Sequence, residues 1–215
     1  MRTLVVAALA VLAVAAPAGA MPRQTDVAPP ELEAPAVDLP IAWRSSRSVG
    51  KPNAGRLVRG VQLPPEGIDF WTFDWGLRES PNRPWRRWGT DRLVRTVLTV
   101  LREYRTANPY APRVGVADLS RRHGGWFGRN FGGLGHASHQ NGLDVDIVYP
   151  RLDGTERSIW DHRLVDRRLA QDLVDRFVAA GAQKIFTGPR LHLRGPRKVV
   201  VPLVHHDDHM HVRIR

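Results

Sequence analysis

The chain of 215 residues contains no cysteine. This absence excludes a disulfide scaffold and also a lipoprotein held to a membrane through a lipidated cysteine. Long apolar runs are scarce as well. After residue 20, no stretch is apolar enough over the roughly 20 residues that a bilayer span requires. The remaining length is enough for one sizeable domain.

The first 20 residues have the organisation of a secretory signal peptide. Arg2 gives a short positive start, residues 4–16 form an apolar run, and Ala18-Gly19-Ala20 fits a cleavage site. We therefore expect an exported protein whose mature chain has no transmembrane segment. Residues 21–42 are rich in proline and have too little apolar surface to form a core, so we expect a linker there and a single domain over 43–215.

Lysine is scarce too, and nearly all of the 32 basic residues are arginine. The formal net charge of +11 suits an anionic surface such as a cell wall. A nucleic-acid-binding protein would also be basic. However, the arginines are spread along the chain rather than gathered in one block. Together with the export signal and the acidic residues of the motifs below, this predicts no nucleic-acid partner.

Two amphipathic helices are predicted. Apolar residues recur at helical spacing after Thr90, a favourable N-cap, until Asn108-Pro109 ends the pattern. A second helix is predicted over 161–180, with Gly181 as the residue that follows its end.

Several short strands are predicted among these helices. Helices mixed with antiparallel-looking strands, without repeated βαβ spacing, indicate an α+β fold, with a small antiparallel sheet flanked by helices and long loops. Residues 46–60 are rich in glycine, serine and basic residues and predict a long surface loop. The glycine-rich run 124–135 is expected to let backbone approach a substrate. Strands are expected at 70–75, 114–119, 143–148, 183–187 and 209–214.

The seven tryptophans are many for this length. Trp85 and Trp88 lie among Arg83, Arg86 and Arg87. We expect most of the rings to pack in the core. The alternative is that tryptophan and arginine line a groove for sugar or peptide through stacking and cation–π contacts.

The most informative stretch is GHASHQNGLDVD at 135–146. His139 and Asp146 would lie about 23 Å apart on a straight strand, so they can share one metal only if the chain turns between them. Asn141-Gly142 can supply that turn, because Asn-Gly readily adopts positive φ. The alternation after the turn places Asp144 and Asp146 on one face of a strand.

A second motif, HHDDHMHVRI, occupies residues 205–214. Alternation from His209 onward places His209 and His211 on one face of a strand and the apolar residues on the other. Together with His139 and Asp146, these imidazoles make a set of nitrogen and oxygen ligands suited to zinc. Catalytic zinc sites have three protein ligands and an open position.

The two motifs resemble the signature of the penicillin-insensitive murein endopeptidases. That family is part of a metallopeptidase group that also holds lysostaphin-type enzymes, D-Ala-D-Ala peptidases and the hedgehog fold. The resemblance covers residues 46–215 and includes SVGKPNAGRL at 48–57, FGRNFGG at 127–133 and KIFTGP at 184–189. Two separate motifs with the family's spacing and order carry it.

The resemblance implies a role for each matched residue. His139, Asp146 and His211 would bind one Zn2+, and His206 and His209 would be the catalytic histidines. His136 matches a second metal position of some members or lines the site. The further Asp and His that those members use have no counterpart that we can place.

The neighbouring acids leave alternatives open. Asp144 either hydrogen-bonds a ligand histidine or helps to bind substrate. Asp207 and Asp208 either orient His206 or His209 or are solvated. The remaining histidines are interpreted as surface or structural residues: His123, His162, His192 and His205.

The resemblance therefore implies a secreted or periplasmic zinc endopeptidase. Its substrate would be the peptide stems of peptidoglycan, at cross-links that join D-Ala to meso-diaminopimelate. The alternatives are a D,D-carboxypeptidase that trims uncross-linked stems and a non-catalytic zinc-containing module that binds the cell wall. His206 and His209 argue against the module, because binding alone needs only the metal ligands.

Overall fold

The computed structural model describes residues 40–126 and 136–215. The predicted signal peptide and nearly all of the predicted linker lie outside these residues. So do residues 127–135 of the glycine-rich run, including the FGRNFGG motif.

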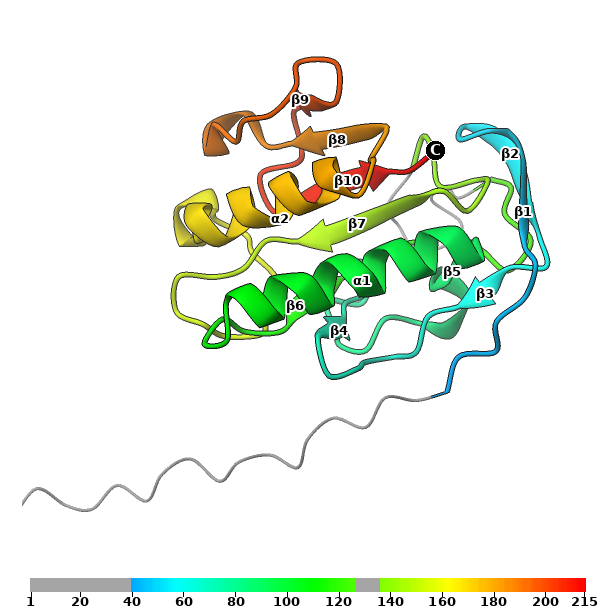
Figure 1. Cartoon of the computed structure of the whole chain (residues 1–215), viewed down its shortest axis with the longest axis horizontal. Helices are drawn as coiled ribbons and strands as arrows, with labels where there is room; N and C mark the ends of the chain where they lie inside the picture. Colours follow the sequence, from blue (N-terminus) through cyan, green and yellow to red (C-terminus); the bar gives the residue numbers. More distant parts are fainter. Residues whose placement is uncertain (1–39, 127–135) are drawn as a thin grey trace, which may run out of the picture. The chain divides into compact units, whose positions relative to one another are not determined.

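A six-stranded mixed sheet forms the centre of the described domain (Figure 1). Its strand order is β4-β6-β7-β10-β8-β9. The pairs β6–β7, β7–β10 and β10–β8 are antiparallel, as predicted, whereas the outer pairs β4–β6 and β8–β9 are parallel. The strand bounds are β4 Phe70–Thr72, β6 Val114–Val116, β7 Asp144–Val148, β8 Lys184–Thr187, β9 Val200–Pro202 and β10 His209–Arg213.

The two faces of this sheet differ because side chains alternate along each strand. Val145 and Ile147 of β7 and Met210 and Val212 of β10 belong to the main hydrophobic core. The intervening residues of the same strands, including Asp146, point to the opposite face. β7 is buried at every position, because it is an inner strand whose acidic face is also covered.

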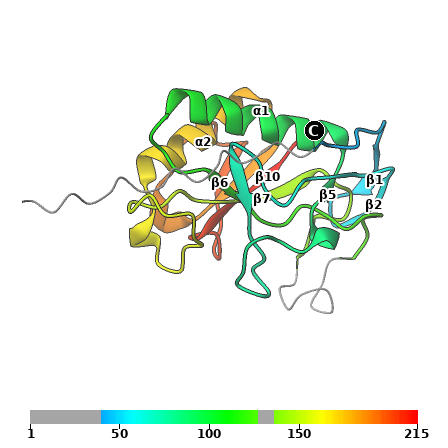
Figure 2. The ribbon, with the colours of Figure 1, turned by 90° about the horizontal axis from the view of Figure 1, so that it is seen from below.

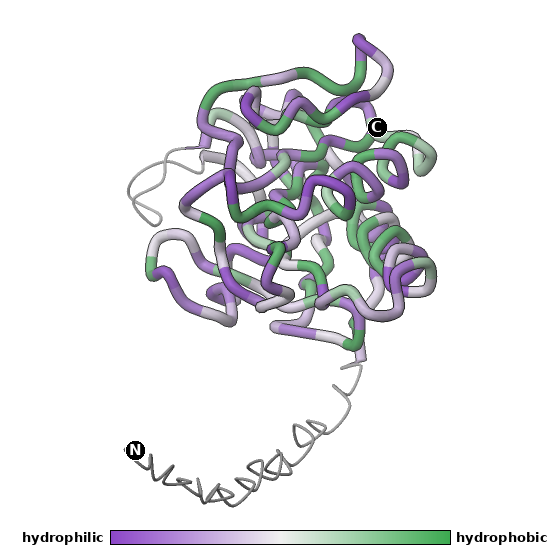
Figure 3. Tube along the Cα trace, turned by 90° about the vertical axis from the view of Figure 1, so that its left-hand side faces the viewer, coloured by the Kyte–Doolittle hydropathy of each residue, from purple (hydrophilic) through white to green (hydrophobic). Residues whose placement is uncertain are grey.

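Two helices, α1 (Asp91–Ala107) and α2 (Arg167–Ala179), lie on the core face of the sheet (Figures 1 and 2). Each helix has a buried apolar face, which includes Leu101 of α1 and Leu173 of α2, and Figure 3 shows hydrophobic and hydrophilic stretches alternating along the described chain. The prediction for α1 is confirmed: the hydroxyl of Thr90 accepts a hydrogen bond from the Leu93 amide at 3.1 Å, and Asn108 caps the other end. The observed elements confirm the α+β class.

The predicted start of the second helix was wrong. Asp161 caps a 3-10 turn, η3 (His162–Leu164), and the helix begins only after Asp166, whose carboxylate accepts from the Leu169 amide at 3.0 Å. Two aspartates that can each cap a turn stand five residues apart, and the apolar pattern does not distinguish them. The end was predicted correctly, with Gly181 at φ +81.

The prediction of a loop over 46–60 was also wrong. This segment forms an antiparallel hairpin of β1 (Arg47–Lys51) and β2 (Ala54–Val58). The sequence shows no alternation of apolar residues here, because only Leu57 is fully buried and the other positions, many of them glycine or polar, are partly or fully exposed. The short strands β3 (Val61–Gln62) and β5 (Trp88–Gly89) form a second two-stranded sheet, and 3-10 turns η1 and η4 cover Pro84–Arg86 and Pro189–Leu191.

Candidate metal centre and its cleft

The pairing of β7 with β10 brings the two sequence motifs together. In this antiparallel register His211 lies directly opposite Asp146, and Arg213 lies opposite Asp144. Directly opposed residues project from the same face of a sheet. One cross-strand register therefore joins residues that are far apart in the sequence.

His139 joins them from the loop before β7. Gly142 has φ +74, so the positive φ predicted for the Asn-Gly turn is present, and a Cβ at Gly142 would lie 2.8 Å from a methyl of Leu57. His139 itself has φ +68, which is costly for a residue with a side chain. Two contacts hold it: its amide donates to Asp144 Oδ2 at 3.2 Å, and its Nδ1 lies 2.5 Å from the carbonyl oxygen of Leu119.

Three potential ligand atoms converge at the base of the site. His139 Nε2 lies 3.2 Å from His211 Nδ1, and Asp146 Oδ1 lies 3.4 Å and 3.1 Å from these two nitrogens. Ligands about 2.0 Å from a tetrahedral zinc ion lie about 3.3 Å from one another. The three atoms therefore have the spacing that such an ion requires.

The other nitrogen of each ring fixes its tautomer. Leu119 O can only accept, so His139 carries its proton on Nδ1; Asp144 Oδ1 lies 3.0 Å from His211 Nε2 and accepts there. Both inward nitrogens then present lone pairs to each other and to a carboxylate. Such an arrangement is repulsive unless a proton or a metal ion lies between them.

Asp146 gives a second test of fit. Its side chain is 1% exposed, and the described groups within 4 Å of its oxygens include the imidazole nitrogens of His139 and His211. A buried carboxylate is costly unless it is paired or coordinates a metal. The residues present therefore fit a bound cation.

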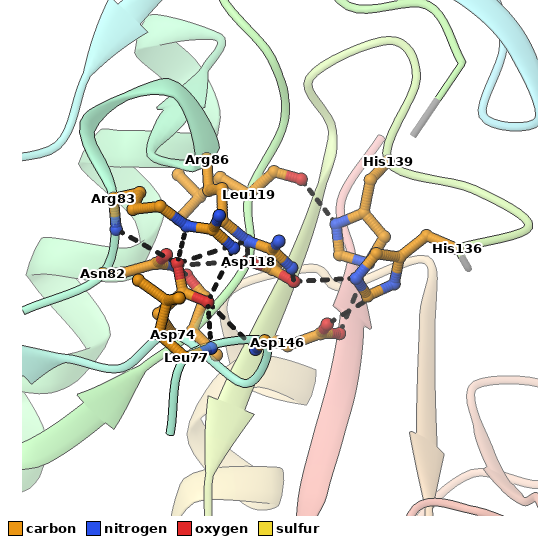
Figure 4. A network of polar contacts seen from close by, with 12 residues as sticks. Asp74, Leu77, Asn82, Arg83, Arg86, Asp118, Leu119, His136, His139 and Asp146 are labelled. Carbon is orange, nitrogen blue, oxygen red and sulfur yellow. Dashed lines mark hydrogen bonds and ion pairs between the residues drawn. The ribbon is translucent and has the colours of Figure 1, made fainter. Parts of the chain in front are cut away.

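His136 lies next to this group. A ligand atom from each of His136, His139 and Asp146 lies within 4.8 Å of the other two, so these three could hold a metal ion. His136 Nε2 is 2.7 Å from Asp118 Oδ2, and its Nδ1 is 3.9 Å from Asp146 Oδ2 (Figure 4).

Asp118 is a site residue that the sequence did not reveal. It is fully buried and also forms a salt bridge with the buried Arg86. The chain after β6 continues beside β7, with the Asp146 amide donating to the Asp118 carbonyl at 2.9 Å, so Asp118 lies next to the site. An acid directly after the apolar run 114–117 was the available signal, but nothing in the sequence connects it to His136.

The buried charges shift the pKa values of these groups. Burial raises the pKa of Asp144, but the hydrogen bond and charge of His211 outweigh it and lower that pKa to about 2. Burial lowers the pKa of His211, but Asp144 and Asp146 raise it to about 9. Burial lowers the pKa of His139, and for Asp146 the neighbouring imidazoles hold the pKa well below its usual range despite burial.

The two histidines predicted to be catalytic stand beside the centre. His209 Nδ1 lies 2.6 Å from Asp208 Oδ1, and its Nε2 lies 3.9 Å from Asp146 Oδ1. His206 Nδ1 lies 2.9 Å from the carbonyl oxygen of Val204, and the two rings are 4.9 Å apart. Asp207 turns away and accepts from the Arg190 amide at 3.2 Å.

One cleft of about 840 Å³ is lined by His136, Asp146, His206, His209 and His211, whereas the buried His139 and Asp144 do not line it. His205, which was expected to lie outside the site, also lines it. Of the tryptophans, Trp75 and Trp160 line the cleft together with Arg78, whereas Trp85 and Trp88 do not. Tryptophan and arginine therefore line a cleft at Trp75, Arg78 and Trp160, and not in the Trp85–Trp88 segment where the sequence suggested it.

These observations define an α+β protein with a candidate metal centre at the base of an open cleft. Residues 48–193 match the model of the penicillin-insensitive murein endopeptidases, and the chain belongs to this peptidase family. No curated protein matches the chain. Among the described residues, no helix combines the length and the apolar character that a membrane span needs.

Proposed function

We propose that the chain is an exported zinc-dependent endopeptidase that hydrolyses peptide cross-links of peptidoglycan between D-Ala and meso-diaminopimelate. Family membership supports the peptidase activity and its murein substrate. The observation that carries the zinc dependence is the convergence of His139 Nε2, His211 Nδ1 and Asp146 Oδ1 at 3.1 to 3.4 Å, with both rings held so that lone pairs face inward.

In this proposal His139, Asp146 and His211 hold the ion. When bound, zinc supplies Lewis acidity toward the scissile carbonyl and the attacking water. Asp144 and the Leu119 carbonyl orient the two rings from behind, which fixes their tautomers. His136 lines the site and is oriented by Asp118.

His206 and His209 divide the remaining chemistry. One accepts the proton of the attacking water and passes a proton to the leaving amine, and the other stabilises negative charge on the carbonyl oxygen. Asp208 orients His209, and the Val204 carbonyl orients His206. Trp75 packs against the His209 ring, with centroids 5.7 Å apart, and helps to keep water away from one side of it.

The test uses purified cross-linked muropeptide dimers, with the products identified by mass spectrometry in the presence and absence of a chelator. We expect dimers to be converted into monomers, and the chelator and His211→Ala each to abolish the conversion. His123→Ala is the control, because His123 is exposed and does not line the cleft.

Other outcomes would replace the proposal with a different one. Release of D-Ala from monomeric stems with intact dimers would indicate a carboxypeptidase. Retention of zinc without any cleavage would indicate a binding module. Full cleavage by His211→Ala would refute the metal centre.

A further inference from the structure

A tight turn carries an arginine to the mouth of the cleft. The buried carboxylate of Asp74 accepts from the amides of Gly76 and Leu77 at 2.9 and 3.1 Å, and the Asp74 carbonyl accepts from the Arg78 amide at 2.7 Å. The same carboxylate forms a salt bridge with Arg83 at 2.5 Å. The hydrogen bonds and the salt bridge of this buried carboxylate therefore fix the conformation of the turn.

Arg78 is held in an unfavourable backbone conformation. Its φ is +60, a backbone conformation that residues other than glycine, asparagine and aspartate rarely adopt. Such strain persists only where the surroundings fix it, and it concentrates at functional sites. Here the hydrogen bonds of the turn fix it, and the result is that Arg78 lines the cleft.

The Arg78 side chain lies on an aromatic wall. Its guanidinium carbon is 4.9 Å from the ring centroid of Trp160, which is 60% exposed. Trp160 meets the edge of Trp75 at 5.5 Å, and Trp75 contacts His209. A continuous surface therefore runs from the arginine at the rim to a histidine of the metal centre.

Arg78 differs from the other charged residues that line the cleft because it has no salt-bridge partner among the described residues. Among the described residues, the arginines that line the cleft are Arg78 and Arg213, and Arg213 is already paired with Asp144 at 2.6 Å. Of the acids that line it, Asp146 lies against the ligand histidines and Asp208 is bound to His209. Within the described residues Arg78 forms no salt bridge, so its guanidinium remains available to an anionic group of a ligand.

We propose that Arg78 and Trp160 form a subsite for a free carboxylate of the peptide stem. The guanidinium binds the carboxylate, and the indole packs against the adjoining peptide. This inference rests on the proposed function and deepens it, because it selects stems with ionised carboxylates over stems whose carboxylates are amidated. The subsite contacts a part of the substrate that does not react.

The experiment compares two substrates on the full chain loaded with zinc. One is a cross-linked muropeptide dimer, and the other is the same dimer with its free carboxylates converted to carboxamides. We expect the wild-type protein to prefer the carboxylate dimer roughly tenfold in kcat/KM, the size expected for a charge-assisted hydrogen bond at a partly exposed site. Arg78→Gln should lose this preference through a higher KM for the carboxylate dimer alone.

Two further variants complete the design. Arg92→Gln removes the same charge from an exposed position of α1 that does not line the cleft, and it should keep the preference. Trp160→Ala should raise KM for both dimers, because the indole contact does not depend on the carboxylate charge.

The outcomes separate the two proposals. If the wild-type protein cleaves neither dimer, the proposed function fails and the subsite fails with it. If it cleaves both dimers equally well, or if Arg78→Gln keeps the preference, the subsite is refuted and the endopeptidase activity stands.

Discussion

Asp144 provides the sharpest test of how the centre is built, through the substitution Asp144→Asn. Its carboxylate is fully buried and contacts His211 Nε2 at 3.0 Å, Arg213 Nε at 2.6 Å and the His139 amide at 3.2 Å. Asparagine preserves the size but removes the charge. It also turns one acceptor into a donor, so that one of these contacts must be lost.

The expected loss of metal affinity follows from the contact with His211. Residues that orient a metal ligand typically contribute 10- to 100-fold in affinity. We therefore expect the zinc dissociation constant of Asp144→Asn to rise by roughly that factor, or about 1.4 to 2.7 kcal/mol. The metal-free protein should also lose about 2 kcal/mol of stability, because charge-assisted hydrogen bonds become neutral ones and Arg213 loses its partner.

Two measurements separate these effects. Competition with a chromogenic chelator gives the zinc dissociation constant, and guanidinium unfolding of the metal-free protein gives the stability. Asp175→Asn is a matched control on the exposed side of α2, where Asp175 accepts from Gln171 at 2.8 Å. A folded Asp144→Asn variant that binds zinc as tightly as the wild-type protein would refute the orienting role.

Three further predictions concern stability. Thr90→Ala should lower the free energy of unfolding by about 1 kcal/mol, because the Leu93 amide loses its cap; Thr90→Ser is the control. Leu101→Ala in the buried face of α1 should cost about 2 to 5 kcal/mol, measured by denaturant unfolding. The metal-free protein should lose stability as the pH rises from about 6.5 to about 9, because folding raises the pKa of His211. The stabilisation is complete at low pH, where the ring is protonated in both the folded and the unfolded state, and it is lost as the folded protein releases this proton. The loss should reach roughly 3 kcal/mol at most, and bound zinc should remove this pH dependence by replacing the proton.

Each of these has a result that would count against it. A Thr90→Ala protein as stable as Thr90→Ser would mean that the cap contributes nothing. A cost below about 1 kcal/mol for Leu101→Ala would show that the core collapses around the lost volume. A flat stability profile between pH 6.5 and 9 without metal would mean that Asp144 and Asp146 do not hold a proton on His211.

The elements that depend on local signals were predictable. A single side chain at Thr90 and the Asn108-Pro109 pair were enough to bound α1, because capping acts over three or four residues. The alternation in β7 and β10 placed the motif residues on the correct faces, because a strand has a period of two. The local signal failed where two candidate caps competed, at Asp161 and Asp166.

The hairpin over 47–58 was missed for a related reason. Its pairing is a property of two segments together, and Gly50 at φ +78 and Gly55 look like loop residues when each is considered alone. At Gly55 a Cβ would lie 2.8 Å from the Asn141 side chain, so this glycine allows the hairpin to pack against the loop before β7. Close approach of backbone to a distant side chain has no signature in a local window.

The sequence by itself determined which residue types could bind a metal, which face of each strand they occupy, and the family to which the chain belongs. Only the tertiary structure decided that His139, Asp146 and His211 meet, that Asp144 and Leu119 fix the ring tautomers, and that Asp118 and Arg78 stand at the centre and the rim. The physical reason is that ligand type and strand period are local properties of the chain. Convergence depends on the register of β7 against β10 and on a turn that brings a third segment to the same point.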